Sequence, residues 1–435
     1  MDQYMFDRAT ETMPRDQLRE LQSKRLRDTV SRVYDNVPFY RKKMRDMGIS
    51  PADIHSVDDL SKLPFTNKTD LRDNYPFGLF AAPQDKITRI HASSGTTGKP
   101  TVAGYSAYDI EVWGELMARA MACAGVTSND IVQVSYGYGL FTGGLGAHYG
   151  AERIGASVVP ASVGNTRRQI MLLEDFGVNA LACTPTYAIV LGEAIREAGI
   201  PLSRFKLRAG VFGAEPWTEV QRKHVEGLLN IHAHDVYGLS EIMGPGVSIE
   251  CSEQQGMHVW EDHFIPEIID PDTEKQLPNG TRGEIVFTTI TKEGMPLIRY
   301  RTHDLTVLDD TPCPCGRTHL RMKKLTGRTD DMLIIRGVNV FPSQVETALA
   351  GIEGIEPQYL LVVRREKNLD TLEVRVELAP SLPSDEVRGI ERIHDAVEAA
   401  VDSMLGIHAE VRLVPSGSIP RSEGKTPRTQ DLRES

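Results

Sequence analysis

Cysteine is scarce in this chain of 435 residues, which contains only five cysteines. Such a small and odd number does not suit a fold held together by disulfides. Long apolar runs are also missing: none reaches the roughly 18 residues of a transmembrane helix, so we expect no membrane partner. The first residues lack the basic and apolar regions of a secretory signal, which favours a cytoplasmic protein.

Basic residues are outnumbered, with 49 lysines and arginines against 60 aspartates and glutamates and a formal net charge of −11. A broad nucleic-acid interface needs clustered positive charge, so this balance argues against a nucleic-acid partner. It leaves room for a small basic pocket that would bind phosphates. The remaining composition, 40% hydrophobic and 25% charged, is that of an ordinary folded protein.

The length suggests a large domain followed by a smaller one. Apolar positions in the first 50 residues recur at helical spacing, and from residue 88 to about 290 short apolar runs alternate with helical patterns. Short buried strands separated by helices predict a layered α/β domain. After a turn at residues 278–280 the pattern becomes that of a β-rich subdomain. The expected strands include residues 131–134, 157–160, 180–182, 208–212 and 284–287.

The pattern changes again after residue 327. Residues 372–378 alternate apolar and charged side chains, as in a half-buried strand. Ser384 suits the N-cap of a helix of about 20 residues, which we expect to be amphipathic. Its apolar positions are Val387, Ile390, Val397, Val401 and Met404. These elements predict a small α+β domain, and we place the two domains at residues 1–327 and 328–435.

The most informative segment is His91-Ala92-Ser93-Ser94-Gly95-Thr96-Thr97-Gly98-Lys99-Pro100. Its glycines let backbone N–H groups turn towards an anion, its hydroxyls add donors, and Lys99 adds positive charge. It is not the phosphate loop of a P-loop hydrolase, because only two residues separate the glycines and Pro100 follows the lysine. The alternative is a solvated linker, so the segment taken alone favours a phosphate site only modestly.

The run from Ser93 to Pro100 resembles the signature loop of the adenylate-forming enzymes, which include acyl-CoA synthetases, luciferases and peptide-synthetase adenylation domains. Five further segments resemble other motifs of that superfamily and follow in its order. One departure is His303, which stands where many members have glycine. The five segments are Gly213-Ala214-Glu215-Pro216, Tyr237-Gly238-Leu239-Ser240-Glu241, Tyr300-Arg301-Thr302-His303-Asp304, Gly327-Arg328-Thr329-Asp330-Asp331 and Pro420-Arg421-Ser422-Glu423-Gly424-Lys425.

The resemblance implies a reaction in two steps. ATP first activates a carboxylate as an acyl-adenylate with release of pyrophosphate, and the thiol of coenzyme A then displaces AMP. Lys425 and Glu241 would be catalytic, Glu241 by holding Mg²⁺, and Asp330 would be the hinge of a small mobile C-terminal domain. Arg336, Gly337 and Val338 would line the coenzyme A channel. The residues implied for ATP or AMP binding are Ser93, Ser94, Gly95, Thr96, Thr97, Gly98, Lys99, Gly213, Ala214, Glu215, Pro216, Asp235, Tyr237, Gly238, Ser240, Asp304 and Arg328.

Residues 136–144, 235–241 and 336–342 narrow the resemblance to the phenylacetate–CoA ligase family. That family is short for its superfamily and typically homodimeric, so we expect a homodimer. The implied substrate is an aryl acid, with phenylacetate as the first choice. Indoleacetate, a substituted benzoate and a deazaflavin cofactor remain open as alternatives. A non-catalytic nucleotide-binding protein of the same fold is disfavoured, because Glu241, Asp304 and Lys425 are all present.

Aromatic and small residues mark the acyl pocket that the resemblance implies. Tyr136, Tyr138 and Phe141 would supply aromatic walls, while Gly143 and Gly144 would leave room for a flat ring. For any single aromatic residue, ordinary core packing is the alternative. No lysine or arginine in this stretch would bind a second carboxylate, which favours a monocarboxylic acid. The remaining pocket positions are Ala147, Ala214 and Val236.

Four residues have the chemistry of a structural zinc site. Cys313 and Cys315 flank a proline in a turn, and Cys251 and His258 lie about 55 residues upstream. Three thiolates and an imidazole match a closed four-ligand site. Because the cysteine spacing departs from the usual pair, buried free thiols beside a surface histidine are the alternative. We favour zinc, which would stabilise the β-rich region rather than take part in the reaction.

Overall fold

The computed structural model describes residues 4–93, 100–329, 333–335, 338–366, 369–380, 387–420 and 428–433. The chain divides into two compact units. The first comprises Met1–Pro216 and Arg222–Lys324, and the second comprises Trp217–Gln221 and Leu325–Ser435. Among the described residues, no helix is both long and apolar enough to cross a bilayer.

The beginning of the chain is helical, as predicted, and forms α1 (Arg8–Glu11), α2 (Arg15–Asn36) and α3 (Pro38–Asp46). Helix α2 buries Leu18, Val30 and Val33. It ends before Val37, whose backbone is extended because a residue that precedes a proline disfavours the helical conformation. Helix α4 (Lys68–Asp73) and 3₁₀ turns at Pro51–Asp53, Val57–Lys62 and Gln84–Lys86 complete this part, and a further 3₁₀ turn, Leu202–Arg204, lies much later in the chain.

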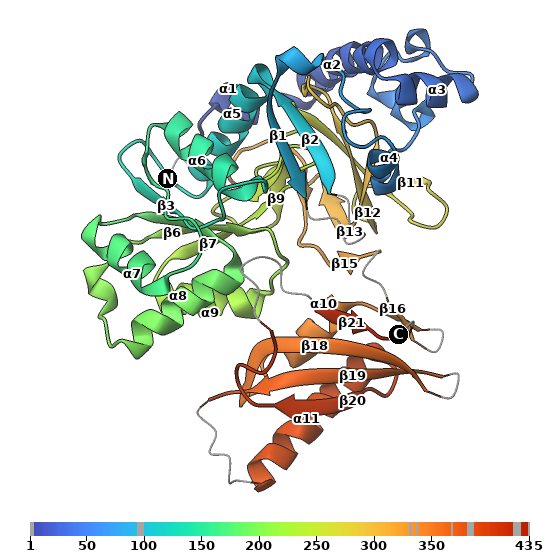
Figure 1. Cartoon of the computed structure of the whole chain (residues 1–435). Helices are drawn as coiled ribbons and strands as arrows, with labels where there is room; N and C mark the ends of the chain where they lie inside the picture. Colours follow the sequence, from blue (N-terminus) through green and yellow to red (C-terminus); the bar gives the residue numbers. More distant parts are fainter. Residues whose placement is uncertain are drawn as a thin grey trace. The chain divides into compact units, whose positions relative to one another are not determined.

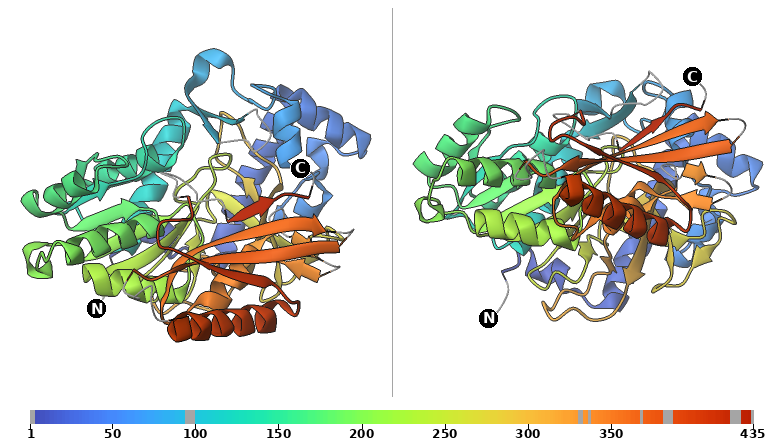
Figure 2. Two further views of the ribbon diagram at one scale, coloured as in Figure 1. Left: turned by 60° about the horizontal axis from the view of Figure 1, so that its bottom comes forward. Right: turned by 90° about the horizontal axis from the view of Figure 1, so that it is seen from below.

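Parallel strands in the order β4–β3–β5–β6–β7 form the layered α/β part. Figures 1 and 2 show α5 and α6 on one side of these strands and α7, α8 and α9 on the other. Each strand predicted here is present, with ends that differ by no more than one residue. The bounds are α5 (Ala107–Cys123), β3 (Ile131–Val134), α6 (Gly143–Ile154), β4 (Ser157–Val159), α7 (Thr166–Asp175), β5 (Ala180–Cys183), α8 (Pro185–Glu197), β6 (Ala209–Gly213), α9 (Glu219–Leu229) and β7 (His232–Tyr237).

The sheet continues beyond β7 with strands in the order β8–β9–β14–β13–β12–β10–β11, all paired antiparallel. The β-rich part therefore begins at β8, earlier than the turn at 278–280 where it was predicted, and β12 contains the expected strand at 284–287. A separate antiparallel hairpin, β1 (Ile87–Ser93) and β2 (Thr101–Ser106), flanks residues 94–99. The other bounds are β8 (Ser248–Glu250), β9 (Met257–Val259), β10 (Phe264–Ile269), β11 (Gln276–Leu277), β12 (Arg282–Thr289), β13 (Tyr300–Asp309) and β14 (Arg321–Met322).

The second unit is α+β, as predicted. Its sheet has the order β20–β19–β18–β21, and Figure 2 shows α11 lying along the sheet. Valines of the sheet and of α11 share one core, which includes Val374, Val397 and Val401. The bounds are β15 (Gly327–Arg328), β16 (Leu333–Ile335), β17 (Val338–Val340), α10 (Pro342–Leu349), β18 (Ile355–Glu366), β19 (Leu369–Leu378), α11 (Val387–Leu405), β20 (Glu410–Val414) and β21 (Thr429–Asp431).

The prediction that Met404 belongs to the apolar face of the last helix is wrong. Met404 is 41% exposed, whereas Leu405 is buried beside Val397 and Val401. Positions four residues apart lie on the same helix face, so the row 397, 401 and 405 continues the buried stripe and Met404 turns towards solvent. Ser384, the predicted N-cap, lies outside the described residues.

Candidate active site

Two neighbouring parallel strands bring two of the predicted ATP- or AMP-binding segments to one edge of the sheet. Strand β6 is buried throughout and ends at Gly213, and β7 ends at Tyr237, so residues 213–216 and 237–241 leave adjacent strands at the same end. Ala214 has φ +72°, a left-handed conformation that non-glycine residues seldom adopt. Glu215 accepts a 2.8 Å hydrogen bond from the backbone N–H of Thr186, in the first turn of α8.

Tyr237 and Asp304 are brought into direct contact, although they belong to different motifs. The Tyr237 hydroxyl donates a 2.6 Å hydrogen bond to Oδ2 of Asp304, and both residues are buried. The Asp304 backbone N–H donates in turn to the Thr302 hydroxyl at 3.0 Å. The Tyr237 ring stacks on Phe287 with centroids 6.1 Å apart. An aromatic ring and a carboxylate from two of the predicted nucleotide-binding segments therefore lie together.

The turn after β7 carries the predicted magnesium ligand. Glu241 is 6% exposed, and the hydroxyl of its neighbour Ser240 shares a 2.9 Å hydrogen bond with the Thr142 hydroxyl. The backbone N–H of Asp235 on β7 donates a 2.8 Å hydrogen bond to the Glu250 carboxylate. The carboxylate of Glu241 offers the hard oxygen ligands that Mg²⁺ prefers. Gly238 and Pro216 complete the predicted nucleotide-binding residues of these two segments.

The aromatic residues predicted for the acyl pocket lie between β3 and α6, Gly143, Gly144 and Ala147 lie in α6, Ala214 follows β6, and Val236 lies in β7. Tyr136 is buried, and burial raises the pKa of its phenol well above the ordinary value. The Tyr138 hydroxyl oxygen lies 3.2 Å from Nδ1 of His148. The Phe141 side chain is 44% exposed. Ala147 and Val236 are buried, while Ala214 is half-buried.

Gly143 and Gly144 allow close packing rather than leaving empty space. A Cβ atom at Gly143 would lie 2.7 Å from the Phe141 ring, and one at Gly144 would lie 2.6 Å from the carbonyl oxygen of Gly137. The first turn of α6 therefore packs directly on the segment that carries the aromatic side chains.

Several predicted site residues lie outside the described residues. They are Ser94, Gly95, Thr96, Thr97, Gly98 and Lys99 of the loop, Asp330 of the hinge, Arg336 and Gly337 of the coenzyme A channel, and Lys425. Ser93 ends β1, where its backbone pairs with Thr101. Arg328 lies in β15 and is half-buried. Val338 begins β17 and packs against the core of the second unit.

The four predicted zinc ligands converge. Sγ of Cys251 lies 3.7 Å from Sγ of Cys313, and Sγ of Cys315 lies 3.4 Å from Nε2 of His258. All four ligand atoms lie within 4.8 Å of one another. The other imidazole nitrogen of His258 lies 3.3 Å from the carbonyl oxygen of His319, which orients Nε2 towards the thiols. Hydrogen bonds from Cys251 and Cys313 hold the pKa of the Cys315 thiol below its usual range.

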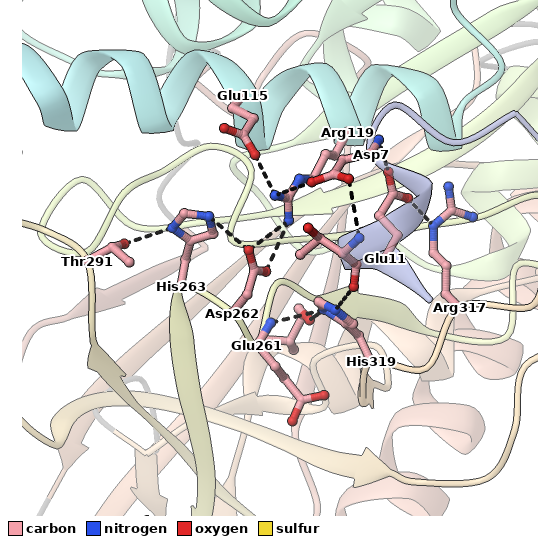
Figure 3. Close-up of polar contacts among 12 residues, drawn as sticks. Asp7, Glu11, Glu115, Arg119, Glu261, Asp262, His263, Thr291, Arg317 and His319 are labelled. Atoms are coloured by element: carbon pink, nitrogen blue, oxygen red, sulfur yellow. Dashed lines mark hydrogen bonds and ion pairs between the residues drawn. The ribbon is translucent and has the colours of Figure 1, made fainter. Parts of the chain in front are cut away.

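The loop that contains Cys313 and Cys315 also holds the N-terminal helix α1 (Figure 3). Arg317 and Glu11 form a fully buried ion pair at 2.7 Å. The Thr318 backbone N–H donates to the Glu11 carbonyl oxygen at 3.1 Å, and Nε2 of His319 lies 3.1 Å from the Thr10 carbonyl oxygen. The sequence analysis gave none of these residues a role, because the ion pair joins positions far apart in the chain.

A buried charged network lies beside this helix (Figure 3). Arg119 of α5 donates to both carboxylate oxygens of Asp262 at 3.0 and 3.1 Å, and Asp262 also pairs with His263 at 3.0 Å. Although burial alone would raise the pKa of Asp262, the charges of His263 and Arg119 hold it well below its ordinary value. These three residues line a polar cavity of about 280 Å³.

The sequence analysis also missed Lys292, which lies just after β12. Its ammonium group is buried and donates to the backbone carbonyls of Glu241 and Ile242 at 2.9 and 2.7 Å. Burial lowers the pKa of Lys292 to about 8, against the opposing effect of the Asp109 and Glu241 carboxylates. Its two hydrogen-bond partners lie 51 and 50 residues earlier in the chain, so the local sequence gave no signal.

Known proteins resemble this chain along its whole length. Residues 8–291 match the model of the AMP-binding enzyme family, and residues 337–433 match that of the AMP-binding enzyme C-terminal domain. A phenylacetate–coenzyme A ligase of Thermus thermophilus is 50% identical over 99% of this chain and 100% of its own length. A phenylacetate–coenzyme A ligase of Escherichia coli K12 is 51% identical over 97% of each chain.

A solved structure shares the fold of the whole chain. The crystal structure of 2-hydroxyisobutyryl-CoA ligase in the postadenylation state, in complex with R3-HIB-AMP, has a TM-score of 0.91 and is 30% identical. The match covers 98% of this chain and 92% of that one. The chain therefore belongs to the AMP-binding enzymes, and within them to the phenylacetate–coenzyme A ligase family.

Proposed function

We propose that this protein is an ATP-dependent ligase that converts an aryl acid, phenylacetate as the first choice, to its coenzyme A thioester. The acid reacts with ATP to give an acyl-adenylate and pyrophosphate, and coenzyme A then displaces AMP. The two phenylacetate–coenzyme A ligases that are 50% and 51% identical over nearly the whole chain support this reaction. The structural observation that carries it is the buried contact between Tyr237 and Asp304, which joins two nucleotide-binding motifs in one site.

The residues divide the work of the first step. The Tyr237 ring would lie beside adenine, and Asp304 would accept hydrogen bonds from the ribose hydroxyls. Donors of residues 93–99 would hold the terminal phosphates, where charge accumulates as the carboxylate attacks the α-phosphorus and pyrophosphate leaves. Glu241 fits a magnesium ligand, and a bound Mg²⁺ would neutralise charge on the phosphate oxygens.

Lys425 would stabilise the charge on the α-phosphate and the attacking carboxylate. Replacing it tests this role, since removing one preorganised donor to developing charge slows a reaction by roughly 10²–10³. We expect Lys425→Ala to lose that much of the adenylation rate, measured as pyrophosphate release. The control is Lys42→Ala, which removes an exposed lysine on α3. Pyrophosphate release at the normal rate by Lys425→Ala would refute the assignment.

The substrate is tested by measuring pyrophosphate and AMP release with ATP and Mg²⁺, with and without coenzyme A. The panel would include phenylacetate, indoleacetate, substituted benzoates, a deazaflavin acid and 2-hydroxyisobutyrate. Fastest turnover on phenylacetate, with AMP release that depends on coenzyme A, is the expected result. Faster turnover on another acid would make that acid, rather than phenylacetate, the substrate assigned to the acyl pocket. No release with any acid despite ATP binding would favour a non-catalytic nucleotide-binding protein.

We also propose that Cys251, His258, Cys313 and Cys315 hold a structural zinc ion. Their ligand atoms lie within 4.8 Å of one another, and the hydrogen bond from His258 to a backbone carbonyl is the usual support for a metal-bound imidazole. When bound, zinc would crosslink the loops after β8 and β13.

Elemental analysis tests the zinc site directly. We expect about one zinc per chain in protein purified without a metal-binding tag, and loss of that zinc in Cys313→Ser. The matched control is Cys183→Ala, since this buried cysteine lies outside the cluster on β5. A zinc content near zero in the unmodified protein would reject the proposal.

The family resemblance supports two further proposals. We propose an adenylation domain at residues 1–327 and a mobile domain at 328–435, and a homodimer that works in the cytoplasm. Light scattering of the purified protein would test the assembly, with twice the chain mass expected. A mass equal to that of one chain would overturn it.

A further inference from the structure

Three successive backbone carbonyls in the turn after β7 accept hydrogen bonds from buried side chains. The Tyr105 hydroxyl donates to the carbonyl of Ser240 at 2.8 Å, and Lys292 donates to the carbonyls of Glu241 and Ile242 at 2.9 and 2.7 Å. Turn carbonyls that strands do not use are usually left to water. Here the backbone on both sides of the Glu241 side chain is fixed from inside the protein.

The Lys292 ammonium is a costly group for such a role. Lys292 is 1% exposed, and its ammonium nitrogen lies 4.3 Å from the centroid of the Tyr105 ring. Tyr105 therefore contacts the ammonium group through its ring and the turn through its hydroxyl. Burying a charge is unfavourable unless the charge is hydrogen-bonded or paired. Two short hydrogen bonds, the aromatic ring and the nearby carboxylates of Asp109 and Glu241 offset that cost.

The segment that carries Lys292 is itself fixed to the hairpin next to the proposed phosphate loop. Asp109, at the start of α5, accepts hydrogen bonds from the backbone N–H groups of Glu293 and Gly294 at 2.7 and 2.8 Å. A Cβ atom at Gly294 would lie 2.8 Å from the carbonyl oxygen of Gly104 on β2. The segment that carries Lys292 is therefore hydrogen-bonded to the start of α5 and packed against β2.

We propose that Lys292 and Tyr105 are positioning residues that hold the turn containing Glu241 in place, and so set the affinity of the enzyme for magnesium. The proposal rests on the proposed function, in which Glu241 binds Mg²⁺. Residues that orient a metal ligand from behind typically change metal affinity or activity by roughly 10- to 100-fold when they are replaced.

Magnesium titration tests the proposal with Lys292→Met and Tyr105→Phe. Pyrophosphate release and, separately, ATP binding by calorimetry are measured with and without Mg²⁺. We expect Lys292→Met to raise the half-saturating Mg²⁺ concentration by roughly 10- to 100-fold. Tyr105→Phe, which loses one hydrogen bond, should raise it less. The affinity for ATP without Mg²⁺ should not change in either variant. The control is Lys62→Met, which removes a lysine paired on the surface with Asp59, and its half-saturating Mg²⁺ concentration should equal that of the unmodified protein.

Unchanged half-saturating Mg²⁺ in both variants would overturn the proposal, whatever happens to the maximal rate or the melting temperature. If Lys292→Met does not fold, Tyr105→Phe alone decides, because the loss of one hydroxyl leaves the ring in place. The ligase proposal fails separately if the unmodified protein releases no pyrophosphate with any acid. Magnesium-dependent ATP binding that the variants lose would then still support the positioning role.

Discussion

The contact between Tyr237 and Asp304 shows how a single hydrogen bond links two motifs that lie 67 positions apart. Strand β7 ends at Tyr237 and strand β13 carries Asp304, so the sheet fixes both backbones before the side chains meet. A carboxylate has about four acceptor positions, so Asp304 can keep the tyrosine hydroxyl and also accept ribose hydroxyls. The tyrosine hydroxyl therefore orients the carboxylate without using up its capacity to bind a nucleotide.

Replacing the two partners should have unequal effects on ATP binding. Asp304→Ala removes hydrogen bonds to a charged group, each of which contributes ~1.5–3 kcal/mol, so we expect the KM for ATP to rise by roughly 10- to 100-fold. Tyr237→Phe keeps the ring and loses one hydroxyl, and the KM should rise by less than about tenfold. Steady-state kinetics at saturating acid would measure both. An unchanged KM in Asp304→Ala would exclude the ribose-binding role.

Buried His234 on β7 gives the protein a predicted sensitivity to acid. Burial, with smaller contributions from Arg222 and His232, lowers the pKa of His234 to about 4. In the unfolded chain the pKa is about 6.5, so below that pH the unfolded state binds more protons and stability falls as the pH decreases towards 4. We expect this histidine to remove roughly 2 kcal/mol of stability between pH 7 and pH 5.

The comparison of His234→Gln with the unmodified protein measures this effect. Urea unfolding at pH 7 and pH 5 should show a smaller loss of stability for His234→Gln, even if that variant is less stable at pH 7. His224→Gln, which replaces a half-exposed histidine on α9, should lose as much as the unmodified protein. Equal losses in all three proteins would mean that other groups cause the sensitivity to acid.

The residue types of the site were predictable from the order of the motifs, but their backbone conformations were not. Ala214 and His303 have φ of +72° and +64°, in the left-handed region that favours glycine. The conformation of His303 explains why many related enzymes have glycine at this position. Lys292 was unpredictable for a similar reason, because its hydrogen bonds to the Glu241 turn depend on tertiary packing that no local pattern records.

At the scale of elements, the loop between β13 and β14 serves two neighbours. It supplies Cys313 and Cys315 to the proposed zinc site and Arg317, Thr318 and His319 to the attachment of α1. Helix α1 has only four residues, too few for a helix to be stable by itself. Its position therefore depends on the loop, and the order of the loop depends in turn on what holds the two cysteines.

Removing the proposed zinc should release α1. We expect a chelator to make the chain cleavable by trypsin after Arg8, in α1, and after Arg15, at the start of α2, because the loop that carries Arg317 loses its crosslink. Cys313→Ser should show the same cleavage without chelator, and Cys183→Ala should stay resistant. Mass spectrometry of the fragments would identify the cut sites. Resistance of the N-terminal segment in Cys313→Ser would show that the loop is ordered without metal.

Element types were more predictable than element registers. Buried strands such as β3 and β5 could be recognised because a short apolar run between helices has one favourable environment, the inside of a parallel sheet. The register of α11 was harder, because Met404 and Leu405 are both apolar and only the packing of Val401 decides which of them faces the core. Sequence periodicity therefore fixes the kind of element before it fixes the buried face.

At the scale of the whole molecule, the two units correspond to two demands of the proposed reaction. In the proposed reaction, adenylation would need the cation of Lys425 at the α-phosphate, whereas thioester formation would need that same region open to coenzyme A. A single static arrangement does not satisfy both demands. The proposed rotation about Asp330 would solve this conflict, since hinges consist of a few residues at the ends of elements. Asp330 follows β15 at the beginning of the second unit.

Stiffening the hinge should separate the two half-reactions. Proline fixes φ near −65° and so restricts rotation at this position. We expect Asp330→Pro to slow coenzyme A-dependent AMP release more than pyrophosphate release, because the second step requires a rearrangement that the first does not. Single-turnover assays that follow the two products separately would measure the ratio. Asp330→Ala is the matched control, since it removes the carboxylate without restricting the backbone. Equal slowing of both steps by Asp330→Pro would argue that the enzyme completes the reaction without moving its small domain.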